Sequence, residues 1–220
     1  MSTILVTGSA SGLGAAIVTA LKTRHDVIPY DAVDGRDVLE PPKFISGKLD
    51  VLINCAGINR INWLENVTDI EWDAIMDVNV KGIFKMSKAC LPELRDSKGT
   101  IINIVSNAAH IPMRCSAAYN ASKGAALILT KQMARELSPD ITVFSISPNR
   151  LADTAMSRQI DEQVVDTRGW TLEEARAYQL QSLLAKEETP TYVVADFIAY
   201  LLQDKMHHKF LTGCDIPYGA

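Results

Sequence analysis

The sequence predicts a single α/β domain with a doubly wound parallel sheet and helices on both faces. Short apolar runs rich in β-branched residues alternate with longer helical segments along the chain. Repeated strand–helix units of this kind build a parallel sheet covered by helices on both sides. A glycine-rich turn follows the first apolar run at once, and 220 residues are enough for one well-buried domain.

The first unit reads as a strand, a turn and a helix. Thr3–Thr7 is the expected strand, and Ala15–Leu21 the expected helix. Glycines between them let the backbone approach a pyrophosphate, while the N-terminus of the helix offers N–H donors and a positive dipole. We therefore expect a Rossmann-like dinucleotide site, although the spacing is Gly-x-x-x-Gly-x-Gly. The residues expected to bind cofactor here are Gly8, Ser11, Gly12, Leu13 and Gly14.

An acidic residue ends the second expected strand. Asp31 follows Asp26–Tyr30 and falls 17 residues after Gly14. A carboxylate at this place accepts hydrogen bonds from both adenosine ribose hydroxyls and repels the 2′-phosphate of NADP. Neither the glycine turn nor Ala32 supplies a cation for such a phosphate. The sequence thus predicts NAD as the cofactor, with a surface loop aspartate as the alternative.

The later elements continue the alternation. A capping-box spacing at Thr68 and Glu71 begins a long helical region. The further expected strands are Asp50–Asn54, Thr100–Val105, Ile141–Ser147 and Phe210–Ile216, and the further helical regions are Thr68–Leu94, Ala117–Glu136 and Pro190–Gln203.

Two connections depart from this regular pattern. Ala32–Leu49 is short, and its two prolines oppose a helix, so we expect only a short third strand at Arg36–Val38. The connection from 154 to 186 is long, which usually indicates a functional segment. Thr171 and Glu174 have capping-box spacing, so part of it is helical. Trp170, Leu180 and Leu183 either line a pocket or pack this segment, and His110 either faces substrate or has no role.

Tyr119 and Lys123 are the strongest chemical signal. Residues at i and i+4 share one helix face, so the phenol and the ammonium can meet. A free tyrosine has a pKa of about 10, and a nearby cation favours the phenolate. Lowering that pKa by roughly three units needs about 4 kcal/mol and gives a group suited to alcohol–ketone chemistry. Taken alone, the pair is more typical of an exposed tyrosine beside a solvated lysine, and the rest of the chain reverses that preference.

Several motifs stand in a fixed order over nearly the whole chain, from Thr3 to about Gly213. They are Thr7-Gly8-x-x-x-Gly12-x-Gly14, Asn54-Cys-Ala-Gly57, Asn79, Ser106, Tyr119-x-x-x-Lys123 and Pro148. This set resembles the short-chain dehydrogenase/reductase family. The resemblance implies that Asn79, Ser106, Tyr119 and Lys123 form a catalytic tetrad.

The resemblance also implies a role for each member. Tyr119 is the acid/base, and Ser106 polarises the substrate oxygen. Lys123 binds the nicotinamide ribose and lowers the tyrosine pKa, and Asn79 anchors a water in a proton relay. By the same resemblance, the further cofactor contacts are Asp37 at the adenine, Asn54, Ala56, Gly57, Tyr119, Lys123, Pro148, and Thr154 at the carboxamide.

Two features depart from the family pattern. Asn149 stands where the family usually has glycine, and asparagine tolerates positive φ better than most residues. The second departure is the shortened segment 32–49. The resemblance further implies that residues 154–186 form a substrate lid and that the domain spans 1–220.

The function expected from these observations is an NAD-dependent oxidoreductase that interconverts a secondary alcohol and a ketone. An NADPH-linked 3-ketoacyl reductase is an alternative, as is a catalytically silent NAD(H)-binding regulator or scaffold. We also expect a homodimer or homotetramer, because Thr68–Leu94 and Ala117–Glu136 carry apolar residues on more than one face. Those residues are Ile75, Val78, Ile83, Phe84 and Met86, and Ala125, Leu127, Ile128, Leu129 and Met133.

Composition argues against several other classes. A net charge of −4 gives no indication of a nucleic-acid surface. No signal-peptide core or membrane-length apolar run is present. The four cysteines are scattered, as in a reduced cytoplasmic protein without a metal site. His207 and His208 are adjacent and are expected to be solvated.

Overall fold

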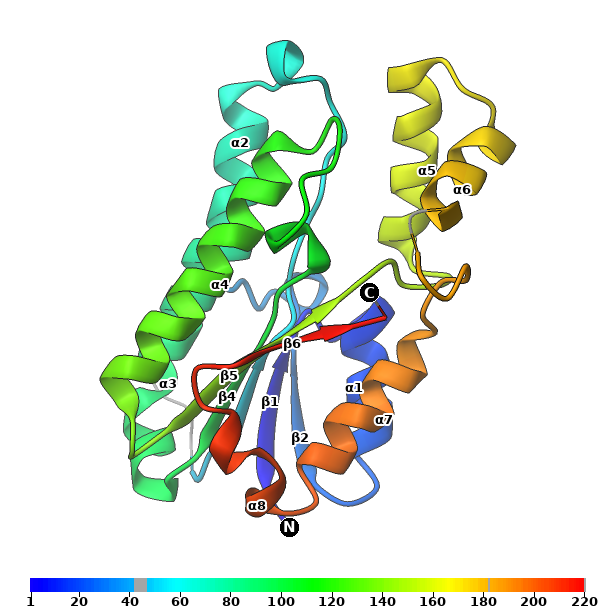
Figure 1. Ribbon diagram of the computed structural model, residues 1–220. Helices are drawn as coiled ribbons and strands as arrows, with labels where there is room; N and C mark the ends of the chain where they lie inside the picture. The colour runs from blue at the N-terminus through cyan, green and yellow to red at the C-terminus, as the bar shows by residue number, and fades with distance from the viewer. Residues whose placement is uncertain (42–46, 182, 220) are drawn as a thin grey trace.

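A six-stranded parallel sheet in the order β2-β1-β3-β4-β5-β6 forms the centre of the computed structural model (Figure 1). The structure describes residues 1–41, 47–181 and 183–219. The strands are β1 (Thr3–Thr7), β2 (Asp26–Tyr30), β3 (Val51–Asn54), β4 (Thr100–Ile104), β5 (Thr142–Pro148) and β6 (Asp215–Tyr218). Because β2 and β3 flank β1 on opposite sides, the strand order reverses there. A crevice at the carboxyl ends of the strands is the usual ligand site of such a sheet.

Helices cover both faces of the sheet. α1 and α7 lie on one face, and α3 and α4 on the other (Figure 1). The helices are α1 (Gly12–Leu21), α2 (Asp69–Met76), α3 (Gly82–Ser97), α4 (Ala117–Leu137), α5 (Ala155–Arg168), α6 (Leu172–Gln181), α7 (Thr191–Leu201) and α8 (Lys205–His208). Single turns of 3₁₀ helix occur at η1 (Ala32–Asp34), η2 (Leu64–Asn66), η4 (Asn107–Ala109) and η5 (Lys209–Leu211), and a π-helix, η3 (Asp77–Lys81), joins α2 to α3. The predicted doubly wound α/β domain is confirmed.

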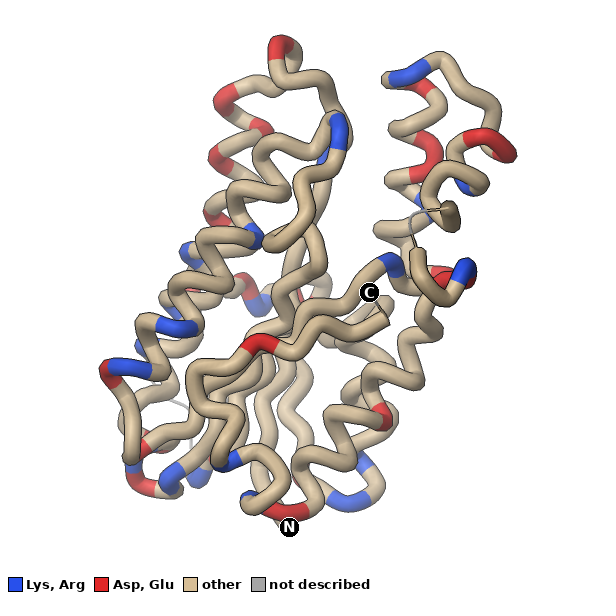
Figure 2. The backbone as a smooth tube through the Cα atoms, viewed as in Figure 1, with Lys and Arg blue, Asp and Glu red and all other residues tan. Residues whose placement is uncertain are grey.

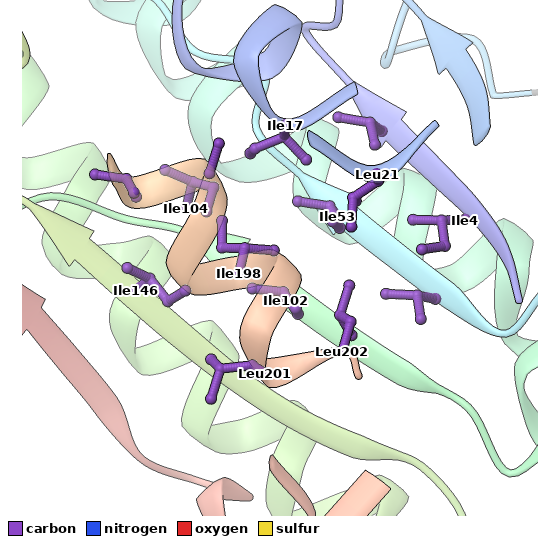
Figure 3. Packing of buried hydrophobic residues seen from close by; sticks show 14 of the residues in the cluster. Ile4, Ile17, Leu21, Ile53, Ile102, Ile104, Ile146, Ile198, Leu201 and Leu202 are labelled. Atoms are coloured by element: carbon purple, nitrogen blue, oxygen red, sulfur yellow. The ribbon is translucent and has the colours of Figure 1, made fainter. Parts of the chain in front are cut away.

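The central strands are apolar on both faces because both faces are covered. On one side, Ile17 of α1 and Ile198 of α7 pack over Ile53 (Figure 3). On the other, Leu52 is buried in a cluster that includes Met86 of α3. Burial of each such side chain contributes about 1.5–3 kcal/mol relative to exposure. The sheet is therefore a rigid platform for the loops at its carboxyl edge.

The predicted third strand at Arg36–Val38 is wrong. The chain turns instead, because the Arg36 N–H donates to the Asp31 carbonyl and the Glu40 N–H to the Asp37 carbonyl, each at 3.0 Å. These local bonds use groups that a strand would pair with β2. β2 therefore stays at the edge of the sheet, where its Pro29 is tolerated.

The last strand begins later than predicted. Residues 205–211 form α8 and η5, and β6 starts only at Asp215. The expectation that His208 is solvated is also wrong, because this side chain is buried. Its Nδ1 donates to the Leu201 carbonyl at 2.8 Å, and its Nε2 lies 3.1 Å from the Thr100 hydroxyl. Burial lowers the pKa of His208, so the neutral ring acts as a structural link between α8 and β4.

The capping box at Thr68 and Glu71 is confirmed. The helical region after it is not continuous, since η3 interrupts it and the Gly82 N–H donates to the Asp77 carbonyl, five residues back. Part of the apolar surface that we expected an oligomer to cover, in this region and in α4, is covered within the chain. Ile75, Ile83, Met86 and Leu127 are buried within the chain, whereas Phe84 and Ile128 are exposed.

The connection after β5 is more helical than predicted. Thr171 and Glu174 begin α6 as expected, through reciprocal hydrogen bonds. α5 was not predicted, because Thr154 caps it with Ser157 at the third position in place of Glu or Gln. Within the described part of the chain, no helix combines the length and the apolar character needed to cross a membrane.

Candidate active site

A cavity of about 840 Å³ opens at the carboxyl ends of the strands. Its walls come from the glycine turn, the end of β2, the segment after β3, the start of α4, and α5 with α6. Two predicted residues, Asn54 and Asn79, lie behind the wall. The other predicted residues all line it: Gly8, Ser11, Gly12, Leu13, Gly14, Asp31, Asp37, Ala56, Gly57, Ser106, Tyr119, Lys123, Pro148 and Thr154.

In the glycine turn, main-chain atoms pack directly against other main-chain atoms. Gly8 has a φ of +66°, and a Cβ there would lie 2.7 Å from the Ala56 Cα. A Cβ on Gly14 would lie 2.0 Å from the Gly8 carbonyl oxygen. Ser11 is the N-cap of α1, yet its side chain caps no N–H of the first turn. Ser9 adds a buried hydroxyl with no partner among the described residues. Unclaimed donors at a helix N-terminus are the elements of a phosphate site.

Asp31 ties the end of β2 to the glycine turn. Its carboxylate accepts hydrogen bonds from the Ala10 N–H at 2.9 Å and the Val33 N–H at 3.1 Å. Asp37 also reaches the cavity, and its carboxylate accepts from the Leu39 N–H at 2.8 Å. Two carboxylates therefore lie at this end of the cavity.

The segment that follows β3 is held by polar side chains of the sheet. Thr7 Oγ1 accepts hydrogen bonds from the Cys55 and Ala56 N–H groups at 3.0 and 3.1 Å. The Asn54 amide donates to Asn103 Oδ1 at 2.8 Å and to Ser87 Oγ at 3.2 Å. Asn54 thus links neighbouring elements inside the fold and does not itself face the cavity.

Asn79 is fully buried in the π-helix η3. Its Oδ1 accepts from the Ile58 N–H, and its Nδ2 donates to the Ile58 carbonyl and to Ser122 Oγ, all at 2.9 Å. The Ser122 hydroxyl in turn donates to the Tyr119 carbonyl at 2.8 Å. The side chain therefore fixes the loop after β3 against the helix that carries Tyr119.

Ser106, Tyr119 and Lys123 converge on the cavity from two elements. Ser106 ends the β4 region and accepts from the Ala108 N–H at 3.1 Å, and its side chain is hydrogen-bonded to the Tyr119 hydroxyl. Tyr119 and Lys123 occupy successive turns of α4, with Lys123 Nζ 5.7 Å from the Tyr119 ring centroid. The ammonium donates to the Ile104 carbonyl at 3.1 Å. The predicted i, i+4 pairing is present, and both side chains are buried.

The pKa shifts correct one expectation. Burial raises the pKa of Tyr119, and the hydrogen bond from Ser106 lowers it only in part. Burial also lowers the pKa of Lys123 to about 8. Low-dielectric surroundings disfavour both charged forms. The predicted fall in the tyrosine pKa is therefore absent from the chain by itself, and Lys123 remains mainly protonated at neutral pH.

The loop after β5 forms another wall of the cavity. Asn149 does not adopt positive φ, so the tolerance of asparagine for that conformation is not used. Its Oδ1 accepts from the Arg150 N–H at 2.9 Å, and its Nδ2 donates to the Gly219 carbonyl at 3.2 Å. Thr154 lies beside Gly12, and its hydroxyl accepts from the Ser157 N–H at 2.9 Å.

Sequence reasoning missed most of the wall at the far end from the glycine turn. The undetected α5 and the loop before α4 supply it. Leu183 lines the cavity, whereas Trp170 packs edge-on against Tyr178 with ring centroids 5.2 Å apart, and Leu180 lies elsewhere. His110 does not line it, since its Nε2 pairs with Asp215 at 2.8 Å. The unpredicted lining residues here include Ile111, Met113, Arg114, Ile160, Val164, Arg168 and Tyr178.

No set of three or more His, Cys, Asp or Glu side chains in the described ranges is arranged to hold a metal ion. The cavity brings a buried tyrosine, a serine and a lysine together beside the glycine turn.

A parallel sheet with a glycine turn after β1 and a Ser-Tyr-Lys group on one cavity defines a class of dinucleotide-dependent oxidoreductase folds. The family model for short chain dehydrogenase matches residues 31–165. The chain belongs to this family.

Curated relatives agree with the family assignment. The chain is 34% identical over 169 residues to 3-oxoacyl-[acyl-carrier-protein] reductase FabG of Staphylococcus aureus, covering 76% of this chain and 63% of that protein. It is 30% identical over 172 residues to cyclopentanol dehydrogenase of Comamonas testosteroni, covering 78% and 64%. The matches thus span less than two thirds of the length of these relatives.

Solved structures share the fold. A 3-ketoacyl-(acyl-carrier-protein) reductase from Brucella melitensis, complexed with NADH, has a TM-score of 0.82 at 22% identity, covering 98% of this chain and 96% of that one. A gluconate 5-dehydrogenase from Beutenbergia cavernae, described as putative and with bound NADP, has a TM-score of 0.83 at 21% identity, covering 98% and 94%.

Proposed function

We propose that this protein is an NAD-dependent oxidoreductase that interconverts a secondary alcohol and a ketone. The observation that carries the proposal is the convergence of Ser106, Tyr119 and Lys123 on one cavity with the glycine turn. A screen of secondary alcohols with NAD, followed by NADH absorbance, tests it. Absence of turnover across the panel would favour the silent NAD(H)-binding regulator.

The residues present fit the cofactor. Gly8 and Gly14 allow the main chain of the turn to pack tightly, and the first turn of α1 offers unclaimed N–H donors for a pyrophosphate. Asp31 is placed to accept from the adenosine ribose, and Lys123 lies near Gly57 to meet the second ribose. NAD, when bound, supplies the hydride acceptor at its nicotinamide ring.

The chain itself orients the substrate and moves a proton. Ser106 donates a hydrogen bond to the substrate oxygen and polarises it. Tyr119 exchanges the proton with that same oxygen, as acid in ketone reduction and as base in alcohol oxidation. Because the pKa of Tyr119 is raised in the chain by itself, Lys123 is proposed to favour the phenolate form only when NAD fills the cavity. Asn79 keeps α4 and the loop after β3 in register, and its main-chain carbonyl in the π-helix is the proposed anchor for a relay water.

A 3-ketoacyl reductase is the second candidate. It is favoured by the similarity to the Staphylococcus aureus reductase. The same residues would perform that reaction, so cofactor preference and a thioester substrate separate it from the first candidate. A cytoplasmic location is part of both proposals, consistent with four free cysteines.

Asp31→Ala should weaken NAD binding and improve tolerance of NADP, because it removes the acceptor for the ribose hydroxyls and the charge that repels a 2′-phosphate. Dissociation constants of both cofactors for both proteins check this. Asp34→Ala is the matched control, since Asp34 is exposed and does not line the cavity. A wild-type preference for NADP would contradict the proposal, and Arg36, which lines the cavity, would then be the cation to substitute.

The segment from 154 to 186 is proposed as a substrate lid. α5 is held over the cavity by hydrogen bonds from the Ile61 N–H to Gln163 Oε1 at 2.9 Å and from Trp63 Nε1 to the Thr167 carbonyl at 3.1 Å. We expect amides of α5 and α6 to gain hydrogen-exchange protection when NAD and substrate are added. α7 serves as the internal reference. Equal protection of α5 in both states would identify a fixed wall.

The proposed assembly is a homodimer or homotetramer through α3 and α4. Phe84 of α3 and Ile128 of α4 are 48% and 63% exposed, and an interface through these helices would cover both. Light scattering at micromolar concentration should give a mass above that of one 24.1 kDa chain. Ile128→Glu should reduce this mass, and Leu184→Glu, at an exposed position outside these helices, should not. A wild-type monomer would reject the proposal.

A further inference from the structure

The end of the cavity away from the glycine turn carries positive charge. Arg168 lies in the last turn of α5, and Arg114 in the loop before α4, and both line the cavity. Figure 2 shows Lys or Arg positions at the upper end of α5 and in the loop before α4, while α1 lies towards the lower part of the view. We propose that Arg168, assisted by Arg114, binds a carboxylate of the substrate. The inference rests on the proposed function for the reaction and adds the substrate class: secondary alcohols or ketones that bear a carboxylate.

Arg168 is held in one orientation. Its guanidinium carbon lies 4.8 Å from the Trp170 ring centroid and 5.0 Å from that of Tyr178. One of its terminal nitrogens donates to the Arg114 carbonyl at 3.3 Å. Aromatic neighbours and a fixed acceptor reduce the side-chain freedom that would be lost on binding. The guanidinium is therefore pre-organised at the cavity wall.

The charge of Arg168 and Arg114 is not balanced locally. Among the described residues neither forms an ion pair, and the Arg168 Nε is buried without a hydrogen-bond partner. Arg150 lines the same cavity but is paired with Asp161 at 2.7 Å and with Glu188. A buried donor without a partner is unfavourable, and an entering anion would supply the acceptor that the Arg168 Nε–H lacks.

The cavity also contains no competing carboxylate at this end. Its acidic lining residues are Asp31 and Asp37, both at the end of β2 beside the glycine turn. Apolar residues that line the cavity together with the arginines include Ile111, Met113 and Val164; of these three only Val164 is buried. A charge-assisted hydrogen bond is stronger than one between neutral groups. Arg114 is exposed, so water can compensate its charge, whereas a neutral substrate would leave the buried Nε–H of Arg168 without an acceptor.

A planar carboxylate is the anion that fits best. An arginine presents parallel N–H donors in one plane, which match the two oxygens of a carboxylate. The guanidinium carbon of Arg168 lies over the rings of Trp170 and Tyr178, and its buried Nε has no partner and is available to a ligand. Arg114, Arg168 and Tyr119 all line the same cavity, so the carboxylate and the reacting oxygen of one substrate are proposed to lie in it together.

The substrate arm of the test compares 3-hydroxybutyrate with its methyl ester, with NAD as cofactor. Wild type should favour the acid over the ester in kcat/KM by at least about tenfold, and Arg168→Gln should lower this ratio by at least about tenfold. Arg158→Gln is the matched control, because Arg158 is exposed on the same helix and does not line the cavity. A purely structural role for Arg168 would reduce turnover of both compounds together and leave the ratio unchanged, which would overturn the proposal.

The second arm does not depend on turnover, so it stands even if no alcohol is oxidised. Butyrate is titrated into wild type, Arg168→Gln, Arg168→Lys and Arg158→Gln in the presence of NADH, with binding followed by ligand-observed NMR. We expect weaker binding by at least about tenfold for Arg168→Gln, an intermediate loss for Arg168→Lys, and none for Arg158→Gln. No butyrate binding to wild type, equal binding to Arg168→Gln, or tighter binding of inorganic phosphate in a parallel titration would each overturn the carboxylate assignment.

Discussion

Tyr119→Phe is expected to lower kcat by at least about two orders of magnitude, the usual scale for a lost general acid or base. The substitution removes only the hydroxyl that is hydrogen-bonded to Ser106. The ring, 8% exposed, keeps its packing in α4, so cofactor affinity should be preserved. Steady-state rates with a substrate found in the alcohol screen, together with NAD dissociation constants, check both parts.

The matched control is Tyr192→Phe, which removes the hydroxyl of an exposed tyrosine on α7. It should leave kcat unchanged. Near-normal turnover in Tyr119→Phe would remove Tyr119 from the chemistry and leave the nucleotide site as the part of the proposal still supported.

The same residue gives the direction of the pH dependence. Because burial raises the pKa of Tyr119, the phenol form predominates at neutral pH in the chain by itself. That form donates the proton in ketone reduction, whereas alcohol oxidation requires the phenolate. Oxidation should therefore accelerate as pH rises, and reduction should not. The Lys123 ammonium, with a pKa of about 8, loses its charge on this same rise and limits the gain.

Elements with a local signal were predictable from the sequence. β1 and β2 match their predicted bounds because each is a short apolar run ended by a turn residue or an acid. The third strand was not predictable in the same way. Whether 36–38 pairs with β2 depends on competing turn bonds from Arg36 and Glu40, which no hydrophobic period reveals. Likewise, the burial of His208 results from contacts with Leu201 and Thr100, the latter 108 residues away in the sequence.

The residues of the site likewise fall into those that the sequence predicts and those that it does not. The glycine turn, Asp31 and the Tyr119–Lys123 pair are sequence-local patterns, and all of them reach the cavity. The substrate end is assembled from α5, α6 and the loop before α4, whose meeting is a tertiary event. α5 lacks the usual capping-box residue, so the helix that carries Arg168 gave no signal. The direction of the tyrosine pKa shift was also missed, because burial was not known.

Gly14→Ala is expected to destabilise the fold and abolish tight NAD binding. The new Cβ would lie 2.0 Å from the Gly8 carbonyl oxygen, a main-chain atom with no rotamer to change. The turn must therefore move, and overpacking of this kind costs about 1–3 kcal/mol. For a chain of this size that cost corresponds to a fall in melting temperature of roughly 2–4 °C per kcal/mol. The N–H groups proposed to hold the pyrophosphate move with the turn.

Gly124→Ala is the control: it makes the same chemical change, but we expect it to stabilise the fold. Gly124 lies inside α4, and a Cβ there meets nothing within 4 Å in the described part of the chain. Alanine is better than glycine in a helix interior by about 0.5–1 kcal/mol, so this variant should melt higher and bind NAD as wild type does. Thermal melts and NAD titrations of the two variants separate a steric effect at the turn from the general loss of a glycine. Wild-type NAD affinity in Gly14→Ala would mean that the glycine turn is only a structural bend, because its displacement would then leave the nucleotide site intact.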